Sequence, residues 1–83
     1  MPTVFLDRGV RFVVYPNDHT PPHFHALGAD WEMVIVLGNC EEIKPSIREI
    51  TGAPTTAQVR HVLRIAQERC GELFERWRQI HDY

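Results

Sequence analysis

The sequence has few of the features that identify an enzyme or a membrane protein. It contains no glycine-rich phosphate loop and no serine, histidine and aspartate in the spacing of a nucleophilic triad. No apolar run approaches the roughly 18 residues that span a bilayer. The opening residues have no basic region followed by an apolar stretch, so we expect no signal peptide. Internal repeats and low-complexity segments are also missing, and we expect a cytoplasmic protein that does not enter membranes.

Cysteine is scarce as well. The two cysteines, Cys40 and Cys70, are far apart in the sequence and do not form a zinc motif. In a cytosolic protein both thiols are expected to stay reduced. Cys70 belongs to the apolar stripe of a predicted helix, where it would pack against the core. Cys40 follows a Gly-Asn turn and is predicted to be exposed.

Neither sign of charge dominates. The formal net charge of −2 and the isoelectric point of about 6.2 give no bulk attraction to nucleic acid or to anionic membranes. The 83 residues, of which 43% are hydrophobic, suffice for one globular domain over 1–83. A chain of this size buries only about 60–65% of its unfolded surface, so association with a partner or a second copy would add stability.

Residues 1–39 predict a β-meander that contains a loop rich in histidine and proline. The strands are expected at residues 3–6, 10–15, 23–27 and 31–37, from their β-branched and aromatic content. In the second strand, alternation directs Val10, Phe12 and Val14 to the core. The fourth strand is the most apolar run of the chain, so we expect it to be covered on both faces.

The remainder is predicted as a connection and one helix. Residues 40–54 form either an edge strand or an irregular link, since Pro45 and Pro54 bracket them. Residues 55–82 have apolar positions three and four apart, and Thr55 with Gln58 makes a capping box. The predicted fold class is α+β, with a three- to four-stranded antiparallel sheet and one long C-terminal helix across it.

This helix is too long for its domain. At 1.5 Å per residue, residues 56–81 would extend on the order of 39 Å, whereas a domain of this size is roughly 30 Å across. The helix therefore overhangs the sheet unless Gly71 bends it. Phe74 and Trp77 lie on the overhanging part and need cover from the N-terminal strands or from another chain.

Residues 17–25, here called the histidine loop, carry the strongest chemical feature. Their sequence is Asn17-Asp18-His19-Thr20-Pro21-Pro22-His23-Phe24-His25. Imidazole titrates near neutral pH and is the commonest metal ligand in proteins, and the two prolines stiffen the loop. We therefore predict the functional surface here. The predicted contact residues are Asn17, Asp18, His19, Pro21, Pro22, His23, Phe24 and His25 of the loop, with Phe74 and Trp77 of the helix.

Two explanations of the histidines remain open. In the first, His23 and His25 share one face of a strand and His19 joins them as ligands of a divalent metal such as zinc. Asp18 or Glu32 would then act as an additional ligand, an orienting group or a general base, and a metal-bound water would hydrolyse a phosphodiester. In the second, the histidines bond neighbouring backbone groups and are structural.

The chain also resembles a known family. The opening Met-Pro-Thr-Val, the short hairpin, the histidine loop, the following strand and the helix with its aromatic patch are similar to the domain of unknown function 4160 family (DUF4160). These are small cytosolic bacterial proteins. The family signature matches Asp18, His19, Pro21, Pro22, His23 and His25. Members often begin the helix with Ser-Pro, where this chain has Thr55-Thr56. The resemblance implies one component of a two-gene module similar to a toxin–antitoxin pair.

Three functions follow as hypotheses. The first is an interaction module that binds a cognate small protein or itself, with no enzymatic activity and no required cofactor. The second is a metal-dependent hydrolase or nuclease with His19, His23 and His25 as ligands. The third is a regulator that binds nucleic acid as a dimer or complex. The monomer is not expected to do so, because glutamates interleave with the arginines of the helix.

Overall fold

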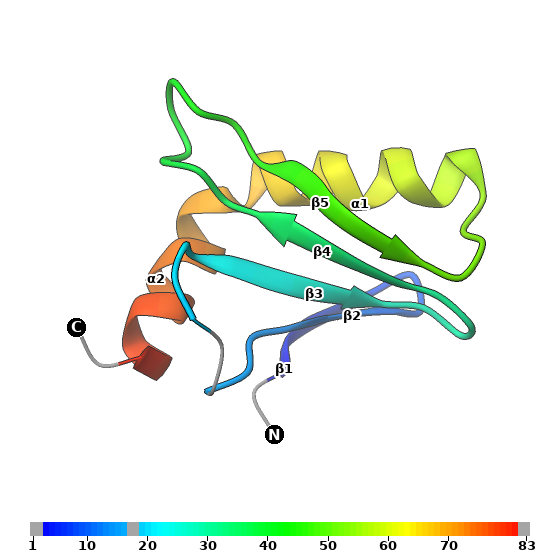
Figure 1. Ribbon diagram of the computed structural model, residues 1–83, viewed down its shortest axis with the longest axis horizontal. Coiled ribbons are helices and arrows are strands. Elements are labelled where there is room, and N and C mark those ends of the chain that lie inside the picture. Colours follow the sequence, from blue (N-terminus) through cyan, green and yellow to red (C-terminus); the bar gives the residue numbers. More distant parts are fainter. Residues whose placement is uncertain (1–2, 17–18, 82–83) are drawn as a thin grey trace.

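A computed structural model describes residues 3–16 and 19–81 of the chain. Its elements are β1 (Thr3–Asp7), β2 (Val10–Val13), β3 (His23–Leu27), β4 (Glu32–Val36), β5 (Ser46–Thr51), α1 (Thr56–Glu68) and α2 (Cys70–His81). The five strands form one antiparallel sheet in chain order, so β1 and β5 are its edges (Figure 1). The predicted α+β class and antiparallel meander are confirmed, with five strands instead of three or four.

The first hairpin follows the sequence pattern closely. Arg8 and Gly9 connect β1 to β2 with φ angles of 51° and 77°, and such a pair of left-handed residues matches the twist of a two-residue hairpin. β2 ends two residues earlier than predicted, but Val10, Phe12 and Val14 all lie in the core as expected.

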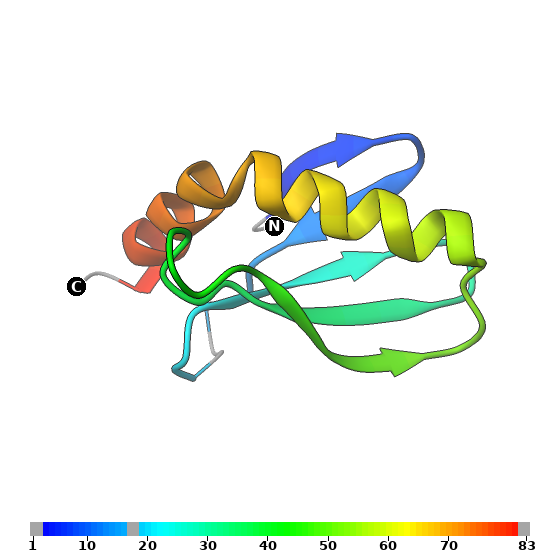
Figure 2. The ribbon, with the colours of Figure 1, turned by 90° about the horizontal axis from the view of Figure 1, so that it is seen from above.

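β4 is covered by helices on one face only. Both helices lie on the same side of the curled sheet (Figure 2). Met33 and Ile35 point to that side and are fully buried. Val34 points to the other side, where no helix packs. Val34 is nonetheless only 7% exposed, so the prediction that β4 is covered on both faces is confirmed for its burial, although helices supply the cover on one face only. An apolar run shows that a strand is buried, but not what buries it.

Residues 40–54 were predicted as either an edge strand or an irregular link, and the presence of β5 confirms the edge strand. It pairs with β4 in an antiparallel register that shifts by one residue at Arg48. Most of its side chains are exposed. An edge strand with so little burial leaves only a weak hydrophobic pattern in the sequence, which is why the strand could not be distinguished from a link.

The C-terminal segment is two helices, and the prediction of one helix over residues 55–82 is wrong. The break is at Arg69, two residues before Gly71. Arg69 donates its amide to the carbonyl of Ile65 and accepts from the amide of Leu73, so the backbone stays hydrogen-bonded through the bend. The capping box of Thr55 is confirmed, with reciprocal bonds of 3.1 and 2.8 Å to Gln58.

The bend lets α2 fold down onto the sheet. Leu73 and Trp77 become buried, Trp77 to 2% exposure, and Phe74 is partly buried against the core. The guanidinium of Arg69 lies 3.7 Å from the ring centre of Phe5 on β1. The cover that the sequence required for the aromatic patch therefore comes from the chain itself. Within the part of the chain that the structure describes, neither helix is long and apolar enough to cross a membrane.

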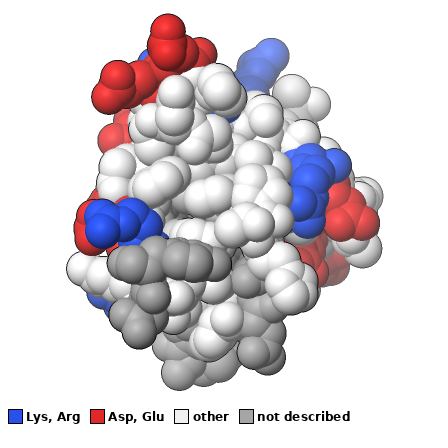
Figure 3. Space-filling view, turned by 60° about the vertical axis from the view of Figure 1, so that its left-hand side comes forward, with Lys and Arg blue, Asp and Glu red and all other residues white. Residues whose placement is uncertain are grey.

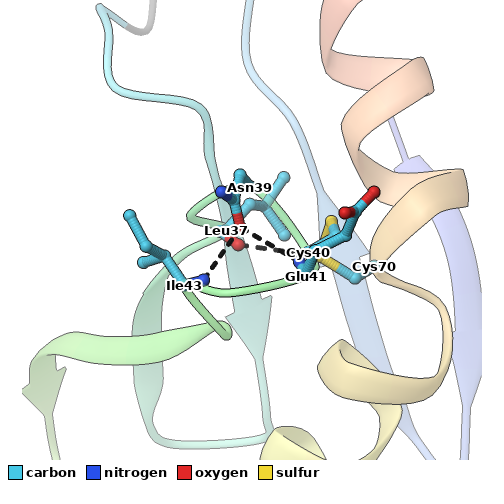
Figure 4. Close-up of a disulfide and its surroundings, with 6 residues drawn as sticks. All are labelled: Leu37, Asn39, Cys40, Glu41, Ile43 and Cys70. Carbon is cyan, nitrogen blue, oxygen red and sulfur yellow. Dashed lines mark hydrogen bonds between the residues drawn. A yellow bond between two sulfur atoms is a disulfide. The ribbon is translucent and has the colours of Figure 1, made fainter.

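Cys40 and Cys70 form a disulfide, which corrects the prediction of reduced thiols (Figure 4). The connection between β4 and β5 turns back towards the start of α2, where Cys70 is buried as predicted. The side chain of Asn39 holds this turn by accepting from the amides of Glu41 and Ile43 at 3.0 and 2.8 Å. The Cα atoms of the two cysteines are 5.7 Å apart across a separation of 30 residues. Sequence spacing alone does not show such proximity.

Candidate interaction surface

The side of the sheet away from both helices, here called the uncovered sheet face, is built by strand register. One row across β2 to β5 contains Val13, His25, Val34 and Glu49. The next row contains Arg11, Leu27, Glu32 and Thr51. Antiparallel partners point to the same side, so both rows lie on this face. It therefore joins two carboxylates, a cation and an imidazole on rigid strands.

Two histidines of β3 are held in place on this face. His23 is 4% exposed and donates through Nδ1 to the carbonyl of Pro21 at 2.8 Å. His25 donates through Nδ1 to the carboxylate of Glu32 at 2.8 Å. The two rings make an edge contact at 5.4 Å, and Tyr15 packs edge-on against His25 at 4.8 Å. Both rings therefore have a defined orientation.

The first of two hollows on the uncovered sheet face adjoins these histidines. It has a volume of about 320 Å³. His19 and Thr20 line it from the histidine loop, with His23 and His25 from β3. On its opposite side it is lined by β5, including Arg48. The structure thus brings the three histidines of the loop to one hollow, together with Glu32.

The second hollow, of about 600 Å³, lies at the other end of the face. Arg11 and the turn that contains Asp30 and Trp31 line it. Glu32 and Thr51 line both hollows. The two hollows therefore meet at the Glu32 position, beside the hydrogen bond to His25.

No ready-made metal site is visible in residues 3–16 and 19–81. Within these ranges, no group of three histidine, cysteine, aspartate or glutamate side chains is arranged to hold a metal ion. His19, His23 and His25 share a hollow, but they do not form such a group. Asp18, which was predicted to assist the metal site, and Asn17, which was predicted as a contact residue, lie outside the described residues. The three-histidine metal site stays a prediction.

Several predicted contact residues lie inside the protein. Phe24 is fully buried on the helix side of β3 and packs against Phe12 at 5.5 Å. Trp77 is likewise part of the core. Their large apolar side chains support the fold in this conformation and are not available as contacts. Pro21 is exposed and follows a cis peptide bond, and the carbonyl of Pro22 accepts from the amide of Leu37 at 3.0 Å.

The surface also includes residues that the sequence analysis did not select. Arg48 and Thr51 belong to β5, whose existence was left open, so their direction could not be predicted. Arg11 and Asp30 were assigned only to a strand and a turn. The available signal for Arg11 was strand alternation, which places it opposite the core positions of β2.

A further pair connects α1 to the first hairpin. Nε2 of His61 lies 3.0 Å from a carboxylate oxygen of Asp7, without the alignment of a hydrogen bond. Arg64 bonds Nδ1 of the same ring at 3.2 Å. The side chain of His61 is only 11% exposed. The ring of His61 therefore packs between α1 and the first hairpin.

The helix arginines do not form a continuous basic face among the described residues. Arg69 makes two hydrogen bonds with Glu72, at 2.9 and 3.0 Å, and Arg78 bonds Glu75 at 2.9 Å. These two arginines are thus each paired with a carboxylate three residues away in the sequence. Such pairs are typical of a solvated helix surface and do not favour binding to a phosphate backbone.

Together, the fold and the surface define a small α+β protein with a structured sheet face of mixed charge. The family model for the domain of unknown function DUF4160 matches residues 9–78. The chain belongs to this family. No curated protein and no solved structure matches the chain.

Proposed function

We propose that this protein is a small interaction module and one component of a toxin–antitoxin-like pair. It binds a cognate small protein through the uncovered sheet face and the histidine loop. The observation that carries the proposal is the His25–Glu32 hydrogen bond where the two hollows meet. It gives the face an ordered polar centre that a partner can recognise.

Preorganisation supports this role. The side chains of the face project from antiparallel strands, and His23 and His25 are each held by a hydrogen bond of 2.8 Å. A surface whose side chains are already ordered loses little conformational entropy when a partner binds. The two hollows offer recesses for side chains of that partner, as in interfaces where a few anchors carry most of the affinity.

The charge pattern indicates a protein as the partner. The uncovered sheet face carries the cations Arg11 and Arg48 together with Asp30, Glu32 and Glu49. At the neighbouring end of the molecule, charged side chains lie above and on both sides of a broad area without lysine, arginine, aspartate or glutamate (Figure 3). Nucleic acid is bound by surfaces that are mainly basic. A mixed face beside an uncharged area suits a protein surface of complementary charge and shape.

The test is direct binding to the protein encoded beside this one. The two proteins are co-expressed, separated and titrated by calorimetry. We expect His25→Ala and Glu32→Ala each to weaken binding by about tenfold or more, as removal of a central contact does. Gln67→Ala, on the exposed side of α1, should leave the affinity unchanged. Unchanged affinity in both face variants, with their fold intact by circular dichroism, would refute the proposal.

A metal-dependent hydrolase is the second candidate, and the same hydrogen bond favours it. A carboxylate that accepts from Nδ1 is the arrangement that commonly orients an imidazole for metal binding or proton transfer. The test is the metal content of untagged protein beside a His23→Ala/His25→Ala variant. A stoichiometric metal that the variant lacks, together with cleavage of a phosphodiester probe, would favour hydrolysis. An absence of metal uptake when zinc is supplied would refute it.

A further inference from the structure

β5 is an edge strand with mostly exposed side chains. Among the described residues its outer edge pairs with no other strand, and every side chain from Ser46 to Thr51 except Ile47 is exposed. Ile50 is 44% exposed although it points to the helix side of the sheet. An open edge presents unpaired backbone N–H and C=O groups, which are a template for another strand. The side chains of β5 determine which kind of strand can pair with this edge.

A bulge in β5 changes which side chains share a face. Ile35 pairs with Ile47 and Val34 pairs with Glu49, so Arg48 is the extra residue. In a regular strand, neighbouring residues point to opposite faces. Here Arg48 and Glu49 both line the 320 Å³ hollow on the uncovered sheet face. Ile47 is on the helix side with its partner Ile35.

Ile50 completes this arrangement. It pairs with Met33, which is buried on the helix side of β4. Ile47 and Ile50 therefore share one face, and the two charged residues between them share the other. The strand Ser-Ile-Arg-Glu-Ile-Thr is therefore symmetric about the Arg48–Glu49 peptide. Residues at equal distances on either side of this peptide are similar in type, opposite in charge at Arg48 and Glu49, and point to the same face of the sheet.

We propose that β5 pairs antiparallel with β5 of a second copy of this chain, with the two-fold axis between Arg48 and Glu49. Arg48 then lies opposite Glu49 of the second copy, and Ile47 lies opposite its Ile50. Each pair lies on one face, as cross-strand pairs must. Without the bulge, this register would place partners on opposite faces and would be excluded.

The occupant is a second copy because the strand complements itself. The two-fold axis generates each opposite-charge pair twice and each isoleucine pair twice. The other edge strand, β1, is not self-complementary in this way. Its residues from Val4 to Asp7 include one carboxylate and no cation. Pairing through β5 makes a ten-stranded sheet and brings the hollows of the two copies together beside the axis. It does not depend on the cognate protein proposed above.

The test is the oligomeric state of the purified full chain in dilute buffer, by analytical ultracentrifugation from low micromolar to millimolar concentration. We expect a dimer that dissociates in the micromolar range, since one strand pair is a small interface. Arg48→Glu and Glu49→Arg each place like charges opposite each other twice, and each should raise the dissociation constant by about ten- to a hundredfold. Arg76→Glu, on α2, is the matched control and should change nothing.

Restoration of the pair is the decisive result. An equimolar mixture of Arg48→Glu and Glu49→Arg should form a heterodimer with near-original affinity, because every opposed pair is again of opposite charge. The double variant Arg48→Glu/Glu49→Arg should self-associate for the same reason. A wild-type chain that is monomeric at millimolar concentration would overturn the proposal. So would single variants that dimerise as well as the wild type, or a mixture that fails to associate.

Discussion

Nδ1 of His25 lies 2.8 Å from a carboxylate oxygen of Glu32, diagonally across β3 and β4. His25 ends the histidine loop, and Glu32 begins the strand after the next turn. Their hydrogen bond therefore connects the histidine loop to β4, a central strand of the sheet. It also connects the two hollows of the uncovered sheet face, so it bears on both stability and recognition.

The first prediction concerns this bond. Glu32→Ala removes the acceptor of an imidazole N–H whose side chain is only 14% exposed. We expect the free energy of unfolding to fall by about 0.5–1.5 kcal/mol, the usual contribution of one such hydrogen bond. Urea unfolding followed by circular dichroism measures it. Glu42→Ala, in the exposed connection before β5, serves as control, and an equal loss there would contradict the assignment.

The second prediction concerns the disulfide between Cys40 and Cys70. Cross-linking residues that are 30 apart lowers the entropy of the unfolded chain, which corresponds to about 3–4 kcal/mol of stability. Reduction with a phosphine should lower the denaturation midpoint accordingly. The Cys40→Ser/Cys70→Ser variant should match the reduced wild type and be insensitive to reductant. Identical unfolding of oxidised and reduced protein would contradict this contribution to stability.

The third prediction compares two glycines. A Cβ atom at Gly28 would overlap the indole ring of Trp31, which is buried, whereas a Cβ atom at Gly71 meets nothing within 4 Å. Gly28→Ala should therefore destabilise the protein by about 1–3 kcal/mol through displacement of the indole. Gly71→Ala, within α2, should stabilise it by about 0.5–1 kcal/mol because alanine favours the helix. Thermal unfolding of both variants measures the difference, and effects of the same sign would refute it.

The fourth prediction concerns the start of α1. Thr55 accepts the amide of Gln58 and has its own amide bonded by the Gln58 side chain. Thr55→Ala removes the hydroxyl acceptor and should cost about 1 kcal/mol. Thr56→Ala, one residue later and exposed, should have little effect. The two variants differ only in position, so equal unfolding midpoints would argue against the cap.

The sequence was sufficient where one local pattern had one structural meaning. The spacing of Val10, Phe12 and Val14 identified the core face of β2, and β3 was predicted with its observed bounds. Thr55 and Gln58 predicted the helix start because a capping box depends on residues three apart. The histidine loop was likewise recognised from composition, and three of its histidines line one hollow.

Local patterns were insufficient where distant residues meet. The helical stripe continues through Arg69, and the only local sign of a break that the sequence offered was Gly71, two residues beyond it. The shape of the domain determines the break, because an unbroken helix would leave Leu73 and Trp77 without cover. The same limit explains Glu32, which could be named as a candidate but not placed beside His25 until the register of β3 and β4 was known.

The sequence by itself determined the α+β class, the four strands of residues 1–39 followed by a helical C-terminal segment, and the loop in which the histidines lie, since these follow from periodicity and composition along the chain. Tertiary structure alone decided three other features. It joined Cys40 to Cys70, it bent the C-terminal segment onto the sheet, and it turned Arg48 and Glu49 to one face. The physical reason is common to all three. Each depends on contacts between distant segments or on strand register. A local sequence pattern does not reveal which distant residues will meet or how strongly they interact.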